Sequence, residues 1–144
     1  MNTYHGAGIL FWTRDVLGKI HVLLCKQSAE VAHSKWILPQ GTWIPNDGFL
    51  PDGKRHYLQT AIRHSHDHLG MTAQYNRPPP TIWTLHVPYF NFEVFACFHP
   101  ELREPQTFNT GLYSESAFFI VDDLPTPREF LLNFYVPALL EKVL

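Results

Sequence analysis

Three side chains that can bind a metal ion or move a proton lie close together near the middle of the chain. His64 and His68 are four residues apart, so in a helix they point the same way, and Asp67 lies beside them. Imidazole suits Zn²⁺, Ni²⁺, Co²⁺ or Mn²⁺ better than Mg²⁺, which prefers hard oxygen ligands. The spacing predicts a metal site of these three residues, with His64 and Asp67 also serving as catalytic groups. In the alternative interpretation they form a solvated polar helix face together with His66.

Basic side chains around the same segment can bind phosphate without a metal. Lys54, Arg55 and Arg63 carry positive charge, and a guanidinium group pairs with phosphate through parallel hydrogen bonds. Lys54 and Arg55 directly follow residues 45–53, which are rich in Pro, Asn, Asp and Gly and are predicted to form a loop. We therefore expect Lys54, Arg55 and Arg63 to form a ligand-binding set.

Apolar runs bounded by turn-forming residues predict the strands of a sheet. The predicted strands are residues 7–12, 20–25, 81–87, 92–98 and 117–121, with a short apolar segment at 36–41. Turn residues at 15–18 join the first two strands into a hairpin, and those at 88–91 join the next two. Residues 27–35 and 100–114 are predicted to be loops.

A first helix is predicted after the loop. Its core-facing side, at 3.6-residue spacing, consists of Leu58, Ala61, Ile62, Ser65 and Leu69. Gly70 is a natural C-terminal stop. Since His64, Asp67 and His68 are not part of that side, we expect them to point away from the core.

A second helix is predicted near the C-terminus. Thr126 can cap it, Pro127 suits its first position and Glu129 completes a capping box. Pro137 is predicted to kink or break this helix, because proline lacks the backbone N–H of the helical ladder.

Two segments resemble a known family. Trp36-Ile37-Leu38-Pro39-Gln40-Gly41 is similar to the W-x-L-P-x-G start of the Nudix box. Residues 61–71 are similar to its A-x-R-E-U-x-E-E-x-G-U end, with matches at Arg63, Gly70 and Met71. With the order of elements, the chain resembles the Nudix (MutT-like) hydrolase superfamily. The resemblance implies an α/β fold, an α/β/α sandwich with a mixed sheet, as one domain over residues 1–144.

The box departs from the family pattern, and we regard it as degenerate. Gly41 precedes Arg63 by 22 residues, where the family has fourteen, so the loop is longer. The positions of the four family glutamates are occupied by Arg55, His64, Asp67 and His68. The resemblance implies a substrate in which a nucleoside diphosphate is linked to another group, or a dinucleoside polyphosphate, cleaved by water with divalent ions, usually Mg²⁺.

Three interpretations remain open. The first is a hydrolase with a rebuilt metal site that takes Mg²⁺, Mn²⁺ or a histidine-preferring transition metal. The second is a catalytically inactive domain that binds a phosphate-bearing ligand through its basic residues. The third is a protein-interaction domain that binds no nucleotide.

Other carboxylates are secondary candidates. Glu115 precedes the strand at 117–121 and resembles a downstream loop glutamate that acts in some Nudix relatives as a base or metal ligand. A plain surface carboxylate is the alternative. Glu93 lies within an apolar strand and faces either the site or solvent. Asp47 and Asp52 of the long loop are further potential ligands.

Composition limits the partners. The chain has 144 residues, a formal net charge of -2 and no Lys/Arg run, which argues against binding extended nucleic acid. No apolar segment of transmembrane length or signal sequence is visible, so we expect a cytoplasmic protein that does not bind membranes. Cys25 and Cys97 are expected to be buried thiols. A nucleotide-like small molecule is the expected partner, and the oligomeric state is left open.

Overall fold

The computed structural model describes residues 3–28, 34–71, 76–100, 102 and 111–144. In chain order the elements are β1 (Tyr4–Arg14), β2 (Ile20–Gln27), β3 (Trp36–Ile37), β4 (Gln40–Thr42), the short 3₁₀ helix η1 (Pro45–Asp47), α1 (Tyr57–Leu69), β5 (Thr81–Val87), β6 (Phe90–Phe98), β7 (Tyr113–Ile120) and α2 (Leu132–Val143). The predicted hairpins are β1–β2 and β5–β6, and both are antiparallel. Parts of the predicted loops 27–35 and 100–114 lie outside the described residues.

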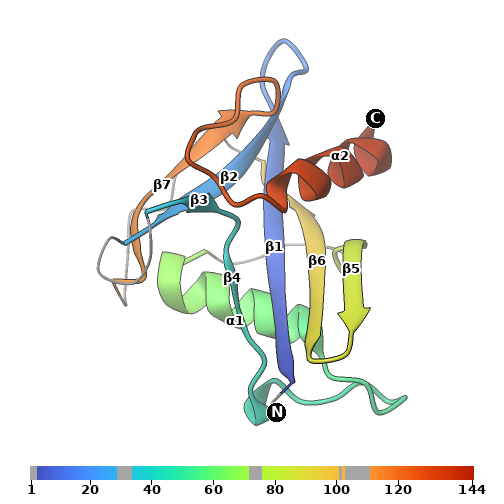
Figure 1. Ribbon diagram of the computed structural model, residues 1–144. Coiled ribbons are helices and arrows are strands. Elements are labelled where there is room, and N and C mark those ends of the chain that lie inside the picture. The colour runs from blue at the N-terminus through green and yellow to red at the C-terminus, as the bar shows by residue number, and fades with distance from the viewer. Residues whose placement is uncertain (1–2, 29–33, 72–75, 101, 103–110) are drawn as a thin grey trace.

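The strands form one mixed sheet, as the family resemblance implied. Its main order is β3-β2-β1-β6-β5, while β4 pairs with β1 and β7 pairs with β2. The central pair, β1 and β6, is parallel, and the other pairs are antiparallel. Helices α1 and α2 cover opposite faces of this sheet (Figure 1), which makes the α/β sandwich.

Side chains that alternate between the two faces of the sheet form a separate hydrophobic core under each helix. In β2, Leu23 and Cys25 pack toward α1, whereas Val22 and Leu24 pack toward α2. Successive strand residues point to opposite faces, so a strand buried on both faces reads as a continuous apolar run. This is why apolar and polar residues do not alternate in the middle of β2.

Helix α1 ends as predicted, but its buried side differs from the prediction. Gly70 caps it in the left-handed conformation, with φ 67°. The buried residues are Tyr57, Thr60, Ala61, His64, Ser65 and Leu69, and Leu58 is only partly buried. The expectation that His64 points away from the core is wrong, because α1 packs against β1 and β4 along the side that carries His64.

Helix α2 starts later than predicted, at Leu132. The segment before it is held in extended form against β3: the Trp36 N–H donates to the Pro127 carbonyl and the Glu129 N–H donates to the Trp36 carbonyl, both at 2.9 Å. The predicted helix start at Thr126 is therefore wrong. Pro137 lies inside α2 without ending it, because the packing of the helix on the sheet outweighs one lost hydrogen bond.

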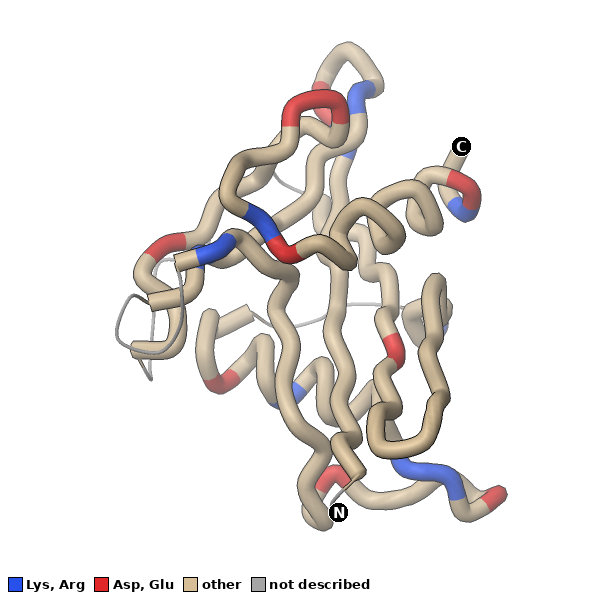
Figure 2. Tube along the Cα trace, viewed as in Figure 1, with Lys and Arg blue, Asp and Glu red and all other residues tan. Residues whose placement is uncertain are grey.

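Charged residues are scattered over the described chain. Figure 2 shows basic and acidic positions interspersed, with no continuous basic stripe among them. In the described parts of the chain, no helix combines the length and apolar character needed to cross a membrane.

Candidate functional site

Arg63 and Asp47 anchor the long loop to α1. The Arg63 Nε donates to Oδ1 of Asp47 at 2.7 Å, and its Nη2 donates to Oδ2 at 3.1 Å and to the Thr42 carbonyl at 2.8 Å. Asp47 also accepts hydrogen bonds from the Thr60 hydroxyl and the Ile44 N–H. Burial opposes ionisation of Asp47, but the hydrogen bonds from Arg63, Ile44 and Thr60 outweigh it and lower its pKa. Arg63 and Asp47 are thus structural partners of each other.

His64 occupies the space between α1 and β4. Its Nε2 lies 2.8 Å from the Tyr113 hydroxyl, and a Cβ at Gly41 would overlap its ring, so only glycine leaves room there. Burial, followed by repulsion from His68 and Arg63, lowers the pKa of His64 to about 3. The ring is therefore neutral near pH 7.

His68 joins His64, but Asp67 does not. The two imidazole rings lie 4.0 Å apart between centroids. Burial lowers the pKa of His68 as well. The Asp67 side chain is 51% exposed and lies 3.4 Å from His66 Nδ1 on the outer side of the helix. The structure thus brings together two of the three predicted metal ligands.

A divalent ion does not fit the predicted set. Among the described residues, no three His, Cys, Asp or Glu side chains gather where they could hold a metal ion. The Nε2 of His64 already contacts Tyr113, and Asp67 points elsewhere. The rings of His64, His68 and Tyr113 contact one another, and we call these three residues the histidine–tyrosine cluster.

Glu115 lies in a strand, not in the predicted loop. It is in β7, directly opposite Lys26 of β2. Directly opposed residues share a face of a sheet, and Lys26 also pairs with Trp36, which packs on the α2 side. Glu115 therefore projects from the face opposite α1 and does not meet His64. The early start of β7 explains the difference from the prediction.

Lys54 and Arg55 line two adjoining hollows, which we call the Arg55 cavities. Their volumes are about 550 and 340 Å³, and both are lined by Lys54, Arg55, Tyr57 and Glu93. Asp52 also lines the larger one. Ligand pockets in proteins have volumes of this order.

The floor of the smaller Arg55 cavity is a polar row across three strands. His5 of β1 is opposite Asn91 of β6, which is opposite His86 of β5, so all three share one face. Glu93, two residues after Asn91, lies on the same face. His86 contacts the Asn91 Oδ1 at 2.7 Å and the Glu93 Oε2 at 3.2 Å.

Sequence reasoning missed most of this row. His5, Tyr57, His86 and Asn91 were not predicted to act, and only Glu93 was considered. The His5 Nδ1 lies 2.9 Å from the Tyr57 hydroxyl, which connects the row to α1. The parallel register of β1 on β6 brings these residues together, and nothing local in the sequence indicates that register.

Arg55 contacts the Trp43 ring and interacts with the Tyr57 hydroxyl. Its guanidinium carbon lies 4.8 Å from the centroid of the Trp43 ring. Within the described part of the chain, its Nε–H is buried and has no hydrogen-bond acceptor. Buried donors are nearly always paired, so an anionic acceptor is the natural complement.

The charge of Arg55 also acts on its neighbours. Burial, then the Arg55 charge and His86, lower the pKa of His5. Burial raises the pKa of Tyr57, against the opposing effect of Arg55. Near neutral pH, His5 and Tyr57 are therefore uncharged hydrogen-bonding groups, while Lys54 and Arg55 bring positive charge to the Arg55 cavities.

Comparison with known proteins finds similarity in structure but not in sequence. Neither a protein-family model nor a curated protein matches the chain. The structure is similar to the NUDIX domain of Shewanella oneidensis NrtR complexed with ADP ribose (TM-score 0.75, 13% identity, covering 100% of this chain and 90% of that one). It is also similar to a C. elegans Ap4A hydrolase in a binary complex (TM-score 0.71, 14% identity, 98% of each chain).

A third neighbour is the C-terminal domain of mouse MUTYH in complex with human PCNA (TM-score 0.66, 10% identity, covering 98% of this chain and 90% of that one). Together with the mixed sheet between α1 and α2, these similarities show that the chain has the Nudix fold, as the sequence resemblance predicted. The fold hosts both nucleotide-binding and protein-binding neighbours, so function has to be argued from the site.

Proposed function

We propose that this protein binds a nucleoside diphosphate-linked ligand in the Arg55 cavities without a divalent metal ion. The observation that carries the proposal is the convergence of Lys54 and Arg55 on a hollow that is also lined by Glu93. The cations suit phosphate oxygens. The carboxylate suits donors such as the hydroxyls of a sugar.

Phosphate recognition rests on Arg55. Its guanidinium is stacked on Trp43, and its buried Nε–H lacks an acceptor among the described residues, so little ordering is needed when a phosphate oxygen binds. Lys54 adds a second positive charge from the adjacent position. Charge-assisted hydrogen bonds of this kind are stronger than neutral ones.

Sugar recognition rests on the polar row. Glu93 is 21% exposed in its side chain and shares His86 with Asn91, so its oxygens are partly desolvated but still reachable. A carboxylate accepts two hydrogen bonds from a pair of adjacent hydroxyls. A ligand with a phosphate near a ribose matches the placement of Lys54 and Arg55 beside Glu93 in the same cavity.

The structural neighbours support a nucleotide-like ligand class. One neighbour is described as complexed with ADP ribose, and another is an Ap4A hydrolase. For this chain we propose binding rather than hydrolysis, because the histidine–tyrosine cluster lacks the carboxylates that hold Mg²⁺.

Calorimetric titration of ADP-ribose and ADP into the protein, in the presence of a chelator, tests the proposal. We expect saturable binding that weakens at least about tenfold in Lys54→Gln/Arg55→Gln, since two charge-assisted contacts are lost. Lys142→Gln, which removes a cation from α2, is the matched control and should bind like the wild type. A parallel assay with Mg²⁺ or Mn²⁺ should show no product.

Two results would count against this proposal. Turnover that requires a metal and disappears in His64→Ala/Asp67→Ala would support a rebuilt hydrolase site. Absence of binding to any nucleotide in a folded sample would favour a protein-interaction domain, as in the neighbour complexed with PCNA.

A further inference from the structure

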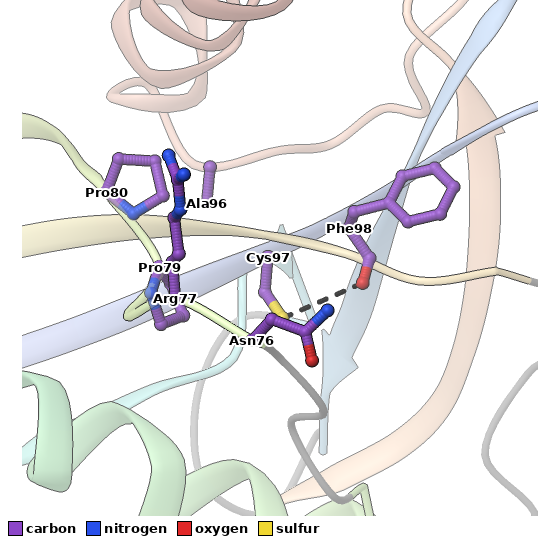
Figure 3. Close-up of a pocket in the computed structure, with 7 residues that line it drawn as sticks. All are labelled: Asn76, Arg77, Pro79, Pro80, Ala96, Cys97 and Phe98. Carbon is purple, nitrogen blue, oxygen red and sulfur yellow. Dashed lines mark hydrogen bonds between the residues drawn. The ribbon is translucent and has the colours of Figure 1, made fainter.

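A separate cavity lies at the edge of β6, next to the residues that precede the first residue of β5, Thr81. Its volume is about 410 Å³, and Figure 3 shows the seven residues that line it. We call it the Arg77 cavity. The lining residues are Asn76, Arg77, Pro79, Pro80, Ala96, Cys97 and Phe98.

Pro79 and Pro80, which directly precede β5, form one wall of this cavity. β5 pairs with β6 only as far as Thr81 opposite Phe95. The last contact is the Ala96 N–H donating to the Pro80 carbonyl at 3.0 Å. Proline has no N–H with which to extend the ladder, so Cys97 and Phe98 continue past the end of the neighbouring strand. The proline rings then form a wall opposite them.

The lining combines apolar walls with one cation. Pro79 is buried, whereas Phe98 is half exposed at the mouth. In Figure 3 the Arg77 side chain extends beside Pro80 and Ala96, and the Cys97 thiol points toward Asn76. Within the described ranges, none of the ion pairs involves Arg77.

We propose that the Arg77 cavity binds a small planar aromatic molecule that carries one carboxylate. Proline rings and the Phe98 ring pack well against a flat apolar surface. Arg77, whose side chain extends beside Pro80 and Ala96, pairs with the carboxylate. Apart from the shared wall residue Pro79, this site uses none of the residues of the Arg55 cavities, so the proposal does not rest on the nucleotide-binding function.

Titration of naphthalene-2-carboxylate into ¹⁵N-labelled full-length protein, followed by NMR, tests the site. We expect saturable shifts of the Ala96, Cys97 and Phe98 amide resonances. Arg77→Gln should weaken binding about tenfold, as expected for the loss of one charge-assisted contact. Lys19→Gln, which removes an exposed cation from the β1–β2 turn, should bind like the wild type. The uncharged naphthalene-2-carboxamide should bind wild type and Arg77→Gln equally weakly.

The proposal is overturned if millimolar carboxylate gives no saturable shift at residues 96–98. It is also overturned if Arg77→Gln, with an otherwise native spectrum, binds as tightly as the wild type.

Discussion

The guanidinium of Arg63 binds the buried carboxylate of Asp47 through two hydrogen bonds, Nε to Oδ1 at 2.7 Å and Nη2 to Oδ2 at 3.1 Å. Asp47 ends η1 in the long loop, and Arg63 lies in the middle of α1. The pair therefore fixes the loop that leads into Lys54 and Arg55. Its integrity matters for the Arg55 cavities as well as for stability.

Asp47→Ala should destabilise the protein by roughly 3 kcal/mol, because it leaves the partly buried Arg63 without its counter-charge. Urea denaturation gives the free energy of unfolding. Asp52→Ala is the control, since this exposed loop carboxylate accepts a hydrogen bond from the Lys54 N–H and, within the described residues, forms no ion pair. A loss below about 0.5 kcal/mol for Asp47→Ala would mean that the pair does not anchor the loop.

Stability should fall as the pH drops below about 6.5, and His64 is the main cause. The pKa of His64 is lowered from its ordinary value of 6.5 to about 3. Below pH 6.5 the unfolded chain binds a proton that the folded protein excludes. The contribution is thus fully present above the unfolded pKa and is lost as the pH falls toward the folded value. The slope is at most about 1.4 kcal/mol per pH unit for one such group.

Urea titrations at several pH values between 6.5 and 4.5 measure this slope. That window lies above the ordinary pKa of 3.8 at which Asp47 takes up a proton in the unfolded chain, and the folded pKa of Asp47 is lower still. His64→Leu should flatten the slope. His68 and His5, whose pKa values are also lowered by burial, act in the same direction, whereas Glu129, whose pKa is raised by burial, acts in the opposite one. His66→Gln, at a side chain that is 66% exposed, should leave it unchanged. An unaltered slope in His64→Leu would contradict the burial of a neutral imidazole.

Gly41→Ala should destabilise the fold by about 2 kcal/mol, since the new methyl group overlaps the His64 ring. The double variant Gly41→Ala/His64→Ala should recover part of this loss, because the smaller side chain leaves space. Thermal and urea unfolding of the four proteins in this cycle measure the coupling. Additive effects would show that the two residues do not compete for the same volume.

Divalent ions should leave the protein unaffected. At millimolar Mg²⁺ or Mn²⁺, we expect a shift in Tm below about 1 °C, because a ligand stabilises a protein only by binding its folded state. Differential scanning fluorimetry with chelator as the reference checks this. A larger shift that His68→Ala removes, while His66→Ala does not, would establish a metal site at the histidine–tyrosine cluster.

Local patterns determined much of the fold. The turn at 15–18 joins β1 to β2, and α1 ends at Gly70 in the left-handed conformation that the sequence predicted. Such features depend on near neighbours in the chain, through turn chemistry, helical spacing and caps. The mixed sheet followed from the resemblance carried by residues 36–41 and 61–71.

Elements that depend on distant partners were predicted less well. Residues 126–129 carry the pattern of a helix start, yet their backbone pairs with Trp36, so α2 begins at Leu132. Glu115 precedes a run that reads as a strand from residue 117, but pairing with β2 extends that strand back to Tyr113. In both cases hydrogen bonds to a remote strand outweighed the local preference.

The sequence by itself determined which chemical groups are present: cations at Lys54 and Arg55, and imidazoles at His64 and His68. Only the tertiary structure decided which of them face a cavity. Packing of α1 on β4 buried His64 against Tyr113, and the β1–β6 register aligned His5 with Asn91. Helical spacing and strand alternation fix a side chain's direction relative to its own element, whereas burial and encounters depend on how that element packs against the others.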